Sequence, residues 1–170
     1  MEYLILLRII HIVSAIFWAG GVMYLALFIV PAVKALGPDG GKFMQQLSRT
    51  NKMPMIMTLA GTLTVLGGIL LIERLSGGFT AGWFGTPHGI VISMGATFAI
   101  IAYCIGIFVN KPTVERIATI GKAAADKGGP PSPEQMAELQ KLRARLFSAI
   151  NITAVLVLCA ALMMSMARYF

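Results

Sequence analysis

The sequence predicts an all-α integral membrane protein, a four-helix bundle, and three observations support this prediction. First, 57% of the 170 residues are hydrophobic and only 12% are charged, whereas about a quarter of the residues in a soluble domain are charged. Second, four stretches reach the length of about 20 apolar residues that a bilayer crossing requires. Third, the basic residues gather in two of the three loops between these stretches, where they orient a chain in a membrane.

The four apolar stretches cover residues 3–30, 53–72, 87–109 and 146–167. The first begins almost at Met1, has no basic leading segment and is longer than a signal peptide, so we expect it to remain as a spanning helix. No composition change, long repeat or low-complexity tract divides the chain. We therefore predict one transmembrane domain over residues 1–170.

The third loop predicts helix on both sides of the glycine and proline residues at 128–131. Helix three is expected to continue to about residue 126, with a kink at Pro112. Helix four is expected over about 132–168, because Ser132 and Gln135 form a capping-box pattern. The two extensions would make a cytoplasmic helical hairpin. Its facing apolar residues would be Val114, Ile117 and Ile120 on one side and Met136, Leu139 and Leu142 on the other.

The other two loops differ in character. In the first, residues 37–41 form a concentrated turn signal of glycine, proline and aspartate, followed by an amphipathic fragment over 42–50. The second is rich in glycine and aromatic residues, and Trp83 suits an anchor at the membrane surface.

The distribution of lysine and arginine predicts the topology. The first and third loops are basic, whereas the only basic residue of the second is Arg74. The positive-inside rule therefore places loops one and three in the cytoplasm and both termini outside, in a multi-pass protein of the cell inner membrane. This placement also accounts for the net charge of +7 without nucleic-acid binding.

Small residues inside the apolar stretches predict close packing. Cys104 and Cys159 have no framework spacing and are interpreted as small buried hydrophobes, not as a disulfide pair. Helix two carries a small-residue face that would let a neighbouring helix approach closely. The same face would suit a homodimer. Its members are Ala60, Gly61, Thr64, Gly67 and Gly68.

Polar groups inside a membrane are costly and are functional candidates. His11 lies roughly a dozen ångströms in from the outer end of helix one, and His88 lies at the outer end of helix three. Two imidazoles from different helices can hold a haem b iron between them. Arg8, one turn outward of His11, would meet a haem propionate, and the small Ser14 would leave room for the ring.

A structural role is the alternative for each of these residues. An intramembrane histidine can simply hydrogen-bond a neighbouring helix, and His88, beside Pro87, can be solvated. Arg8 can extend to the lipid headgroups. For Asn151 we expect a hydrogen bond between helices and not a ligand role.

Methionine offers a rival metal, because thioether sulfur selects Cu(I). Met163, Met164 and Met166 cluster near the outer end of helix four, in the leaflet that holds both histidines. A hydrolase is not indicated, because the sequence has no catalytic Ser-His-Asp or Cys-His set, no paired intramembrane carboxylates and no phosphate loop.

The run of residues 7–21 resembles the first helix of two membrane families, the HemJ-type protoporphyrinogen oxidases and the CopD-type copper-resistance proteins. In both, a histidine is followed by a tryptophan seven residues later and then by glycine, as His11, Trp18 and Gly20 are here. Pro31 at the helix end is closer to the CopD pattern. Residues 53–68 and 86–89 resemble the second helix and the opening of the third helix of the HemJ type.

The HemJ resemblance implies haem b binding by His11, with His88 at the position of the third-helix histidine and Trp18 beside the cofactor. In that family a lysine follows two residues after the third-helix histidine, whereas this chain has Ile90. At position 90 the chain therefore departs from the HemJ pattern, and the resemblance does not imply porphyrinogen oxidation.

The sequence thus predicts a membrane b-type haem protein that acts in electron transfer or in a haem-dependent oxidation near the outer leaflet. It names neither a catalytic residue nor the redox partner. Ligation by His11 and His88 together favours electron transfer, and an open or methionine-bound iron favours gas or substrate chemistry. The alternatives are a CopD-like copper protein and a cofactor-free membrane scaffold.

Overall fold

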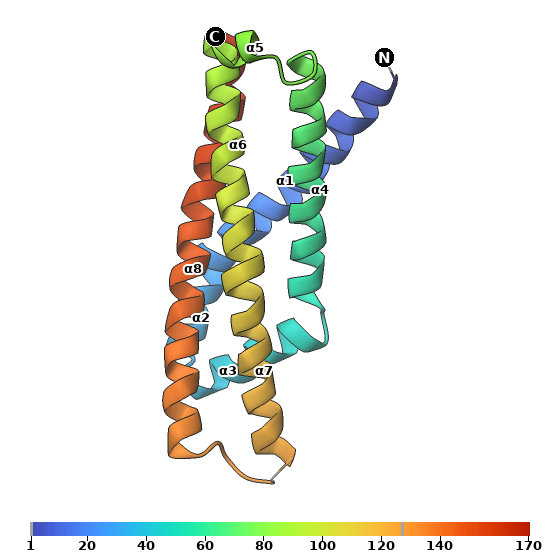
Figure 1. Ribbon diagram of the computed structural model, residues 1–170. Coiled ribbons are helices and arrows are strands. Elements are labelled where there is room, and N and C mark those ends of the chain that lie inside the picture. The colour runs from blue at the N-terminus through green and yellow to red at the C-terminus, as the bar shows by residue number, and fades with distance from the viewer. Residues whose placement is uncertain (1, 127) are drawn as a thin grey trace.

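The computed structural model describes residues 2–126 and 128–170, and the regular structure within them is entirely helical. Four long helical rods are each long and apolar enough to cross a membrane. Figure 1 shows them with two short helices, α3 (Pro38–Arg49) and α5 (Ala81–Phe84), in the connections. The first rod is α1 (Glu2–Tyr24), η1 (Leu25–Ile29) and α2 (Val30–Ala35), and the second is α4 (Met53–Leu75). The third is α6 (Pro87–Ile105), η2 (Gly106–Asn110) and α7 (Lys111–Asp126), and the fourth is α8 (Pro133–Met166) with η3 (Ala167–Tyr169).

Large apolar side chains cover the outside of the rods. Ile16 is 70% exposed and Phe108 is 72% exposed, and many other isoleucine, leucine and phenylalanine side chains are more than half exposed. An apolar surface of this extent indicates contact with a lipid bilayer and not with water. The predicted all-α fold with four long apolar helices is therefore confirmed.

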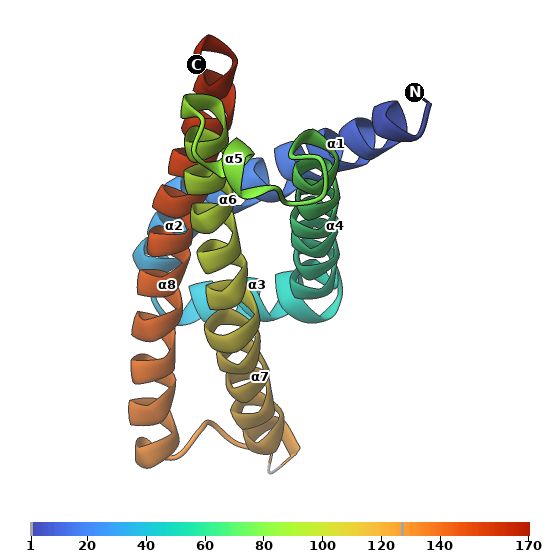
Figure 2. The ribbon, with the colours of Figure 1, turned by 45° about the horizontal axis from the view of Figure 1, so that its top comes forward.

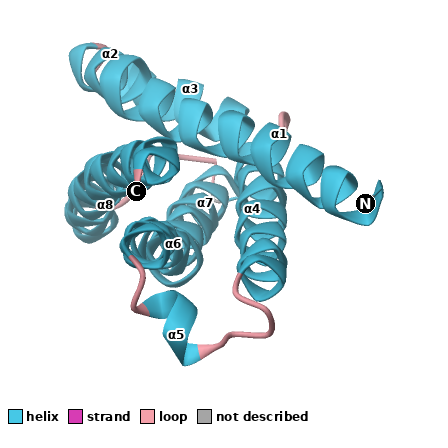
Figure 3. Cartoon of the chain, turned by 90° about the horizontal axis from the view of Figure 1, so that it is seen from above, coloured by secondary structure: helices cyan, strands magenta, loops and turns pink. Residues whose placement is uncertain are grey.

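The rods are arranged as two pairs. α1 packs against α4, and α6 packs against α8; seen from above, α1 passes α4 obliquely, whereas α6 and α8 stand side by side (Figure 3). Both termini lie at the end that carries α5, whereas α3 and the α7–α8 hairpin lie at the opposite end (Figures 1 and 2). The two pairs meet in a core of small and apolar residues. This core consists of Trp18, Val22, Ala60, Ala99, Ala102, Val157 and Ala160.

Small residues determine how closely the paired helices approach. Ala60, Gly61, Thr64 and Gly67 of α4 are buried, and a Cβ atom on Gly67 would lie 3.2 Å from the Cβ of His11. The predicted small-residue face is therefore confirmed as a packing surface. Because α1 covers it within the same chain, this face is not free for a second copy.

The predicted hairpin is confirmed at its cap and in its core. Ser132 and Gln135 form both hydrogen bonds of the capping box, and Ile120 and Leu139 are buried. Arg116 Nε donates to Glu138 Oε1 at 2.7 Å, which ties α7 to α8. The facing pattern differs at one residue, because Met136 is 40% exposed. Val114 and Ile117 of α7 instead pack against a second core cluster, which includes Leu146 and Phe147 of α8.

A widened helical turn precedes Pro112, the residue at which we predicted a kink. The π-helical segment η2 ends two residues before Pro112, and η1 ends two residues before Pro31. A proline lacks an N–H group and its ring collides with the carbonyl four residues earlier. A π turn moves that carbonyl away, and the backbone N–H of Lys111 bonds to Gly106 five residues back. The helix therefore continues through both prolines.

The predicted turn at 37–41 is wrong beyond its first residue. The turn is confined to Leu36 and Gly37, and α3 begins at Pro38. Gly37 adopts a φ of +56°, which favours glycine, and proline is well suited to a first helical turn. Gly40 serves a different purpose, because a Cβ atom there would collide with the carbonyl oxygen of Val33.

Three residues of the apolar stretches are placed otherwise than predicted. Cys104 is exposed and Cys159 is half-buried, and both are free thiols. The absence of pairing agrees with the prediction for these two residues, whereas the burial of Cys104 was wrong because its side of α6 faces outward. Asn151 is exposed on α8 and so does not lie in a contact between helices.

Candidate functional site

His11 is held in the seam between α1 and α4. Its ring lies over Gly68, where a Cβ atom would be 3.0 Å from Cε1, and its Cβ and backbone lie over Gly67. Its Nδ1 lies 2.8 Å from the backbone oxygen of Thr64. A carbonyl oxygen only accepts, so Nδ1 carries the hydrogen and donates it. In the neutral imidazole, Nε2 is then left with a lone pair.

His88 repeats this arrangement at the other helix pair. Its Nδ1 lies 2.7 Å from the backbone oxygen of Ala167 in η3, so this nitrogen also donates and Nε2 keeps its lone pair. The ring meets Trp83 edge to face, with 6.1 Å between ring centroids. Each histidine therefore has the orienting Nδ1–H···O=C bond that is typical of metal-binding histidines.

The structure does not bring the two histidines to one level. Trp18 and Tyr103 mark a common depth, because their rings meet with 6.3 Å between centroids. His11 precedes Trp18 by seven residues, or about 10 Å of helix, whereas His88 precedes Tyr103 by fifteen residues, or about 22 Å. His88 thus lies further toward the end of the bundle than His11. Two axial ligands of one iron must both reach the same metal atom from opposite sides.

A comparison through α4, which runs roughly parallel to α6 (Figure 1), gives a separation of about 13 Å. Thr62 of α4 shares a 2.7 Å hydrogen bond with the Tyr103 hydroxyl, and Gly68, beneath His11, is six residues or about 9 Å further along. His11 therefore lies near the middle of the half of the rods that ends at the termini, and His88 lies at the end of that half.

Two further predicted cofactor residues take part in helix packing. Ser14 is buried, donates to the backbone oxygen of Ile10 at 2.6 Å and accepts from the Thr64 hydroxyl at 3.1 Å. Trp18 packs against Gly61, where a Cβ atom would lie 3.1 Å from its ring. Arg8 is exposed, as a group that reaches a headgroup or a propionate would be.

The methionines of the copper alternative do not share a surface. Met163 and Met164 pack toward Gly95 of α6, where a Cβ atom would meet both, whereas Met166 is 44% exposed. Among the described residues, no group of three or more histidine, cysteine, aspartate or glutamate side chains could hold a metal.

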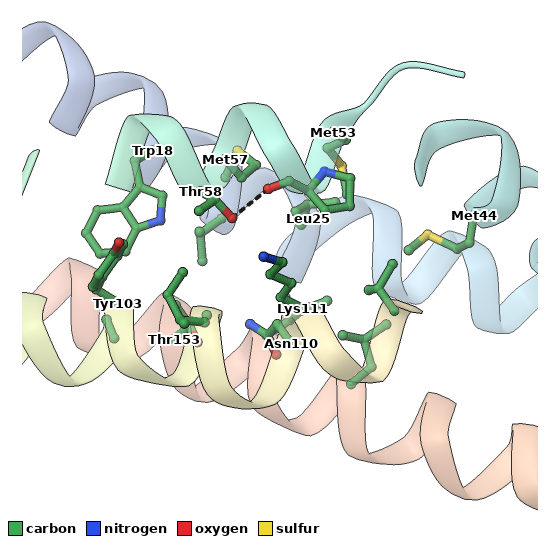
Figure 4. Close-up of a pocket in the computed structure, with 18 residues that line it drawn as sticks. Trp18, Leu25, Met44, Met53, Met57, Thr58, Tyr103, Asn110, Lys111 and Thr153 are labelled. Atoms are coloured by element: carbon green, nitrogen blue, oxygen red, sulfur yellow. Dashed lines mark hydrogen bonds between the residues drawn. The ribbon is translucent and has the colours of Figure 1, made fainter. Parts of the chain in front are cut away.

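Sequence reasoning missed a pocket in the other half of the bundle. It is a cavity of about 90 Å³ between the two helix pairs, bounded by Trp18, Met57, Tyr103 and Lys111 (Figure 4). The available signal was Asn110-Lys111, two polar residues at the end of an apolar run. No known protein family, curated protein or solved structure matches the chain.

Proposed function

We propose that the chain is a multi-pass protein of the inner membrane that binds haem b through His11 in the outer half of the bilayer. The four apolar rods and the outward apolar surface support the membrane setting. The basic first and third loops support a cytoplasmic location for α3 and the α7–α8 hairpin. Both termini then lie outside, at the end that holds the histidines.

One observation carries the haem proposal, namely the hydrogen bond from His11 Nδ1 to the Thr64 oxygen. It selects the tautomer whose Nε2 can donate a lone pair to a metal, and it fixes the ring plane. Gly67 and Gly68 let the imidazole lie against α4 without a competing side chain. The imidazole of His11 is thus suited to serve as one axial ligand of a haem iron.

The remaining residues of the site have supporting roles. Arg8, one turn outward of His11 and exposed, suits a propionate at the membrane surface. Ser14 and Thr64 fasten α1 to α4 through their hydroxyls and thereby keep His11 at a fixed depth. Bound haem supplies iron-based redox chemistry, and the protein tunes it through the ligand, burial and charge.

The depth difference between the histidines supports one of the two predicted activities. Because His88 lies about 13 Å further out than His11, only His11 would supply an imidazole to the iron. An iron with one histidine keeps a position for a substrate or a gas, so the proposal favours a haem-dependent oxidation over simple electron transfer.

Two matched variants test the ligand. His11→Ala should lose nearly all haem from detergent-purified protein, whereas His88→Ala should retain haem with an unchanged absorption spectrum. Each variant removes a histidine that bonds to a backbone oxygen of a neighbouring helix, so each controls for the structural cost in the other. Haem retention in His11→Ala, or its loss in both variants, would contradict ligation by His11 alone.

A further inference from the structure

The pocket in the cytoplasmic half of the bundle has the chemistry of a lipid site. Its wall is mostly apolar, formed by Trp18, Val22 and Leu25 from the first rod and by Met53 and Met57 from α4. Both π-helical segments border it, since Leu25 belongs to η1 and Gly106 to η2. The pocket is therefore formed where the two widened turns face each other.

Two polar groups in the pocket lack partners in the described part of the chain. The Asn110 Oδ1 atom is buried and forms no hydrogen bond there. Lys111 extends from α7 toward Met57 and Thr58 of α4 (Figure 4), and no carboxylate is among the described residues that line this pocket. A buried acceptor without a donor is costly. The pocket thus presents one cation and one unmet acceptor to whatever fills it.

The pocket continues into a neighbouring hollow between α4 and α7. The hollow has a volume of about 350 Å³ and shares Pro54, Thr58 and Lys111 with the pocket. Lys52 and Glu115 also border it, so its charged groups sum to one positive charge. Met55 at its rim is 64% exposed. The hollow therefore links the pocket to the lipid-facing surface at the level where the apolar run of helix three ends.

We propose that this pocket receives part of an acyl chain of an anionic glycerophospholipid from the cytoplasmic leaflet, with its phosphate beside Lys111. A cavity of about 150 Å³ holds one benzene ring, so 90 Å³ accommodates a segment of chain and the headgroup occupies the hollow. Phosphatidylglycerol supplies the negative charge that Lys111 would meet. The proposal shares only the membrane setting with the haem proposal.

Native mass spectrometry of the purified full chain tests this with equal amounts of phosphatidylglycerol and phosphatidylcholine of the same acyl chains. The wild type should bind phosphatidylglycerol in preference. Lys111→Gln should lower that preference about fivefold, the effect of one lysine on an anionic lipid. Lys122→Gln should leave it unchanged, because Lys122 is an exposed cation of the same helix away from the pocket. Equal binding of both lipids by the wild type would overturn the proposal, as would an unchanged preference in Lys111→Gln.

A filled pocket gives an independent test. Gly106 lines the pocket and a Cβ atom on it would meet nothing within 4 Å, so the side chain of Gly106→Leu begins in open space and should remove the bound lipid. Its helical circular dichroism should match the wild type, because leucine is a better helix former than glycine. Retention of lipid by the folded variant would overturn the proposal. Displacement of phosphatidylglycerol by an equal concentration of oleate would also overturn it, because the ligand would then be a free fatty acid.

Discussion

At the scale of single residues, the glycines of α4 explain why His11 is fixed. His11 lies on the Gly67–Gly68 surface, and its ring bonds to the Thr64 oxygen one turn away. The sequence revealed His11 as a candidate, because a histidine in an apolar stretch is conspicuous. It could not reveal the bond, because a backbone acceptor on another helix leaves no mark in the side-chain pattern.

A glycine replacement tests this packing. Gly68→Ala places a Cβ atom 3.0 Å from His11 Cε1, so the ring must move, and we expect a loss of about 1–3 kcal/mol of stability from overpacking together with weaker haem retention. The control is Gly20→Ala, because a Cβ atom there meets nothing within 4 Å. Thermal unfolding should show a lower midpoint for Gly68→Ala and no loss for Gly20→Ala. Equal midpoints would contradict the close approach.

The hydroxyl pair between α4 and α6 has a measurable effect as well. Tyr103→Phe removes the 2.7 Å hydrogen bond to Thr62 but keeps the ring against Trp18. We expect a loss of about 0.6 kcal/mol, the typical coupling of such a bond in a membrane protein. A double-mutant cycle with Thr62→Val measures it. A coupling energy of zero would mean that the two hydroxyls do not stabilise the junction of the helix pairs.

At the scale of elements, local rules predicted the start of α8 and the extension of helix three well. Ser132 and Gln135 form the capping box that their spacing indicates. The same rules failed at Gly40, which we read as part of a turn, because tight packing on Val33 and turn formation both select glycine. From the sequence we interpreted Pro31 as a helix end and Pro112 as a kink, whereas a π turn precedes each proline in the structure. A sequence shows where a proline interrupts the helical hydrogen bonds, but it does not show how the backbone accommodates that proline.

The α7–α8 hairpin should loosen in acid. The hydrogen bond from Arg116 lowers the pKa of Glu138 below its ordinary value of 4.5. A carboxyl whose pKa is lower in the folded than in the unfolded state stabilises the fold above the ordinary value, and this stabilisation is lost as the pH falls through the lowered pKa. Hydrogen exchange of α7 amides, corrected for intrinsic rates, should therefore accelerate below pH 4.5.

The matched control for the hairpin is Arg116→Gln. This variant lacks the Arg116–Glu138 ion pair, so its α7 amides should exchange faster than those of the wild type near neutral pH and should show less acceleration in acid. An acid response of equal size in the two proteins would show that another group controls the hairpin.

At the scale of the whole molecule, two helix pairs joined near their middle account for the placement of both candidate sites. The depth of each residue follows from α6 and α4 meeting at Thr62 and Tyr103. The sequence placed His11 and His88 in one leaflet but could not give their relative depth, because that depends on which residues of different helices meet. The pocket was unpredictable for the same reason, because its wall comes from all four rods.

The measurement that tests the central claim most directly is the absorption spectrum of dithionite-reduced, detergent-purified protein with and without carbon monoxide. The account predicts one haem b per chain and a spectrum that shifts when carbon monoxide is added, because one histidine leaves an iron position available. A full complement of haem that carbon monoxide does not perturb would contradict single ligation by His11. A featureless spectrum after haem-replete expression would contradict haem binding altogether.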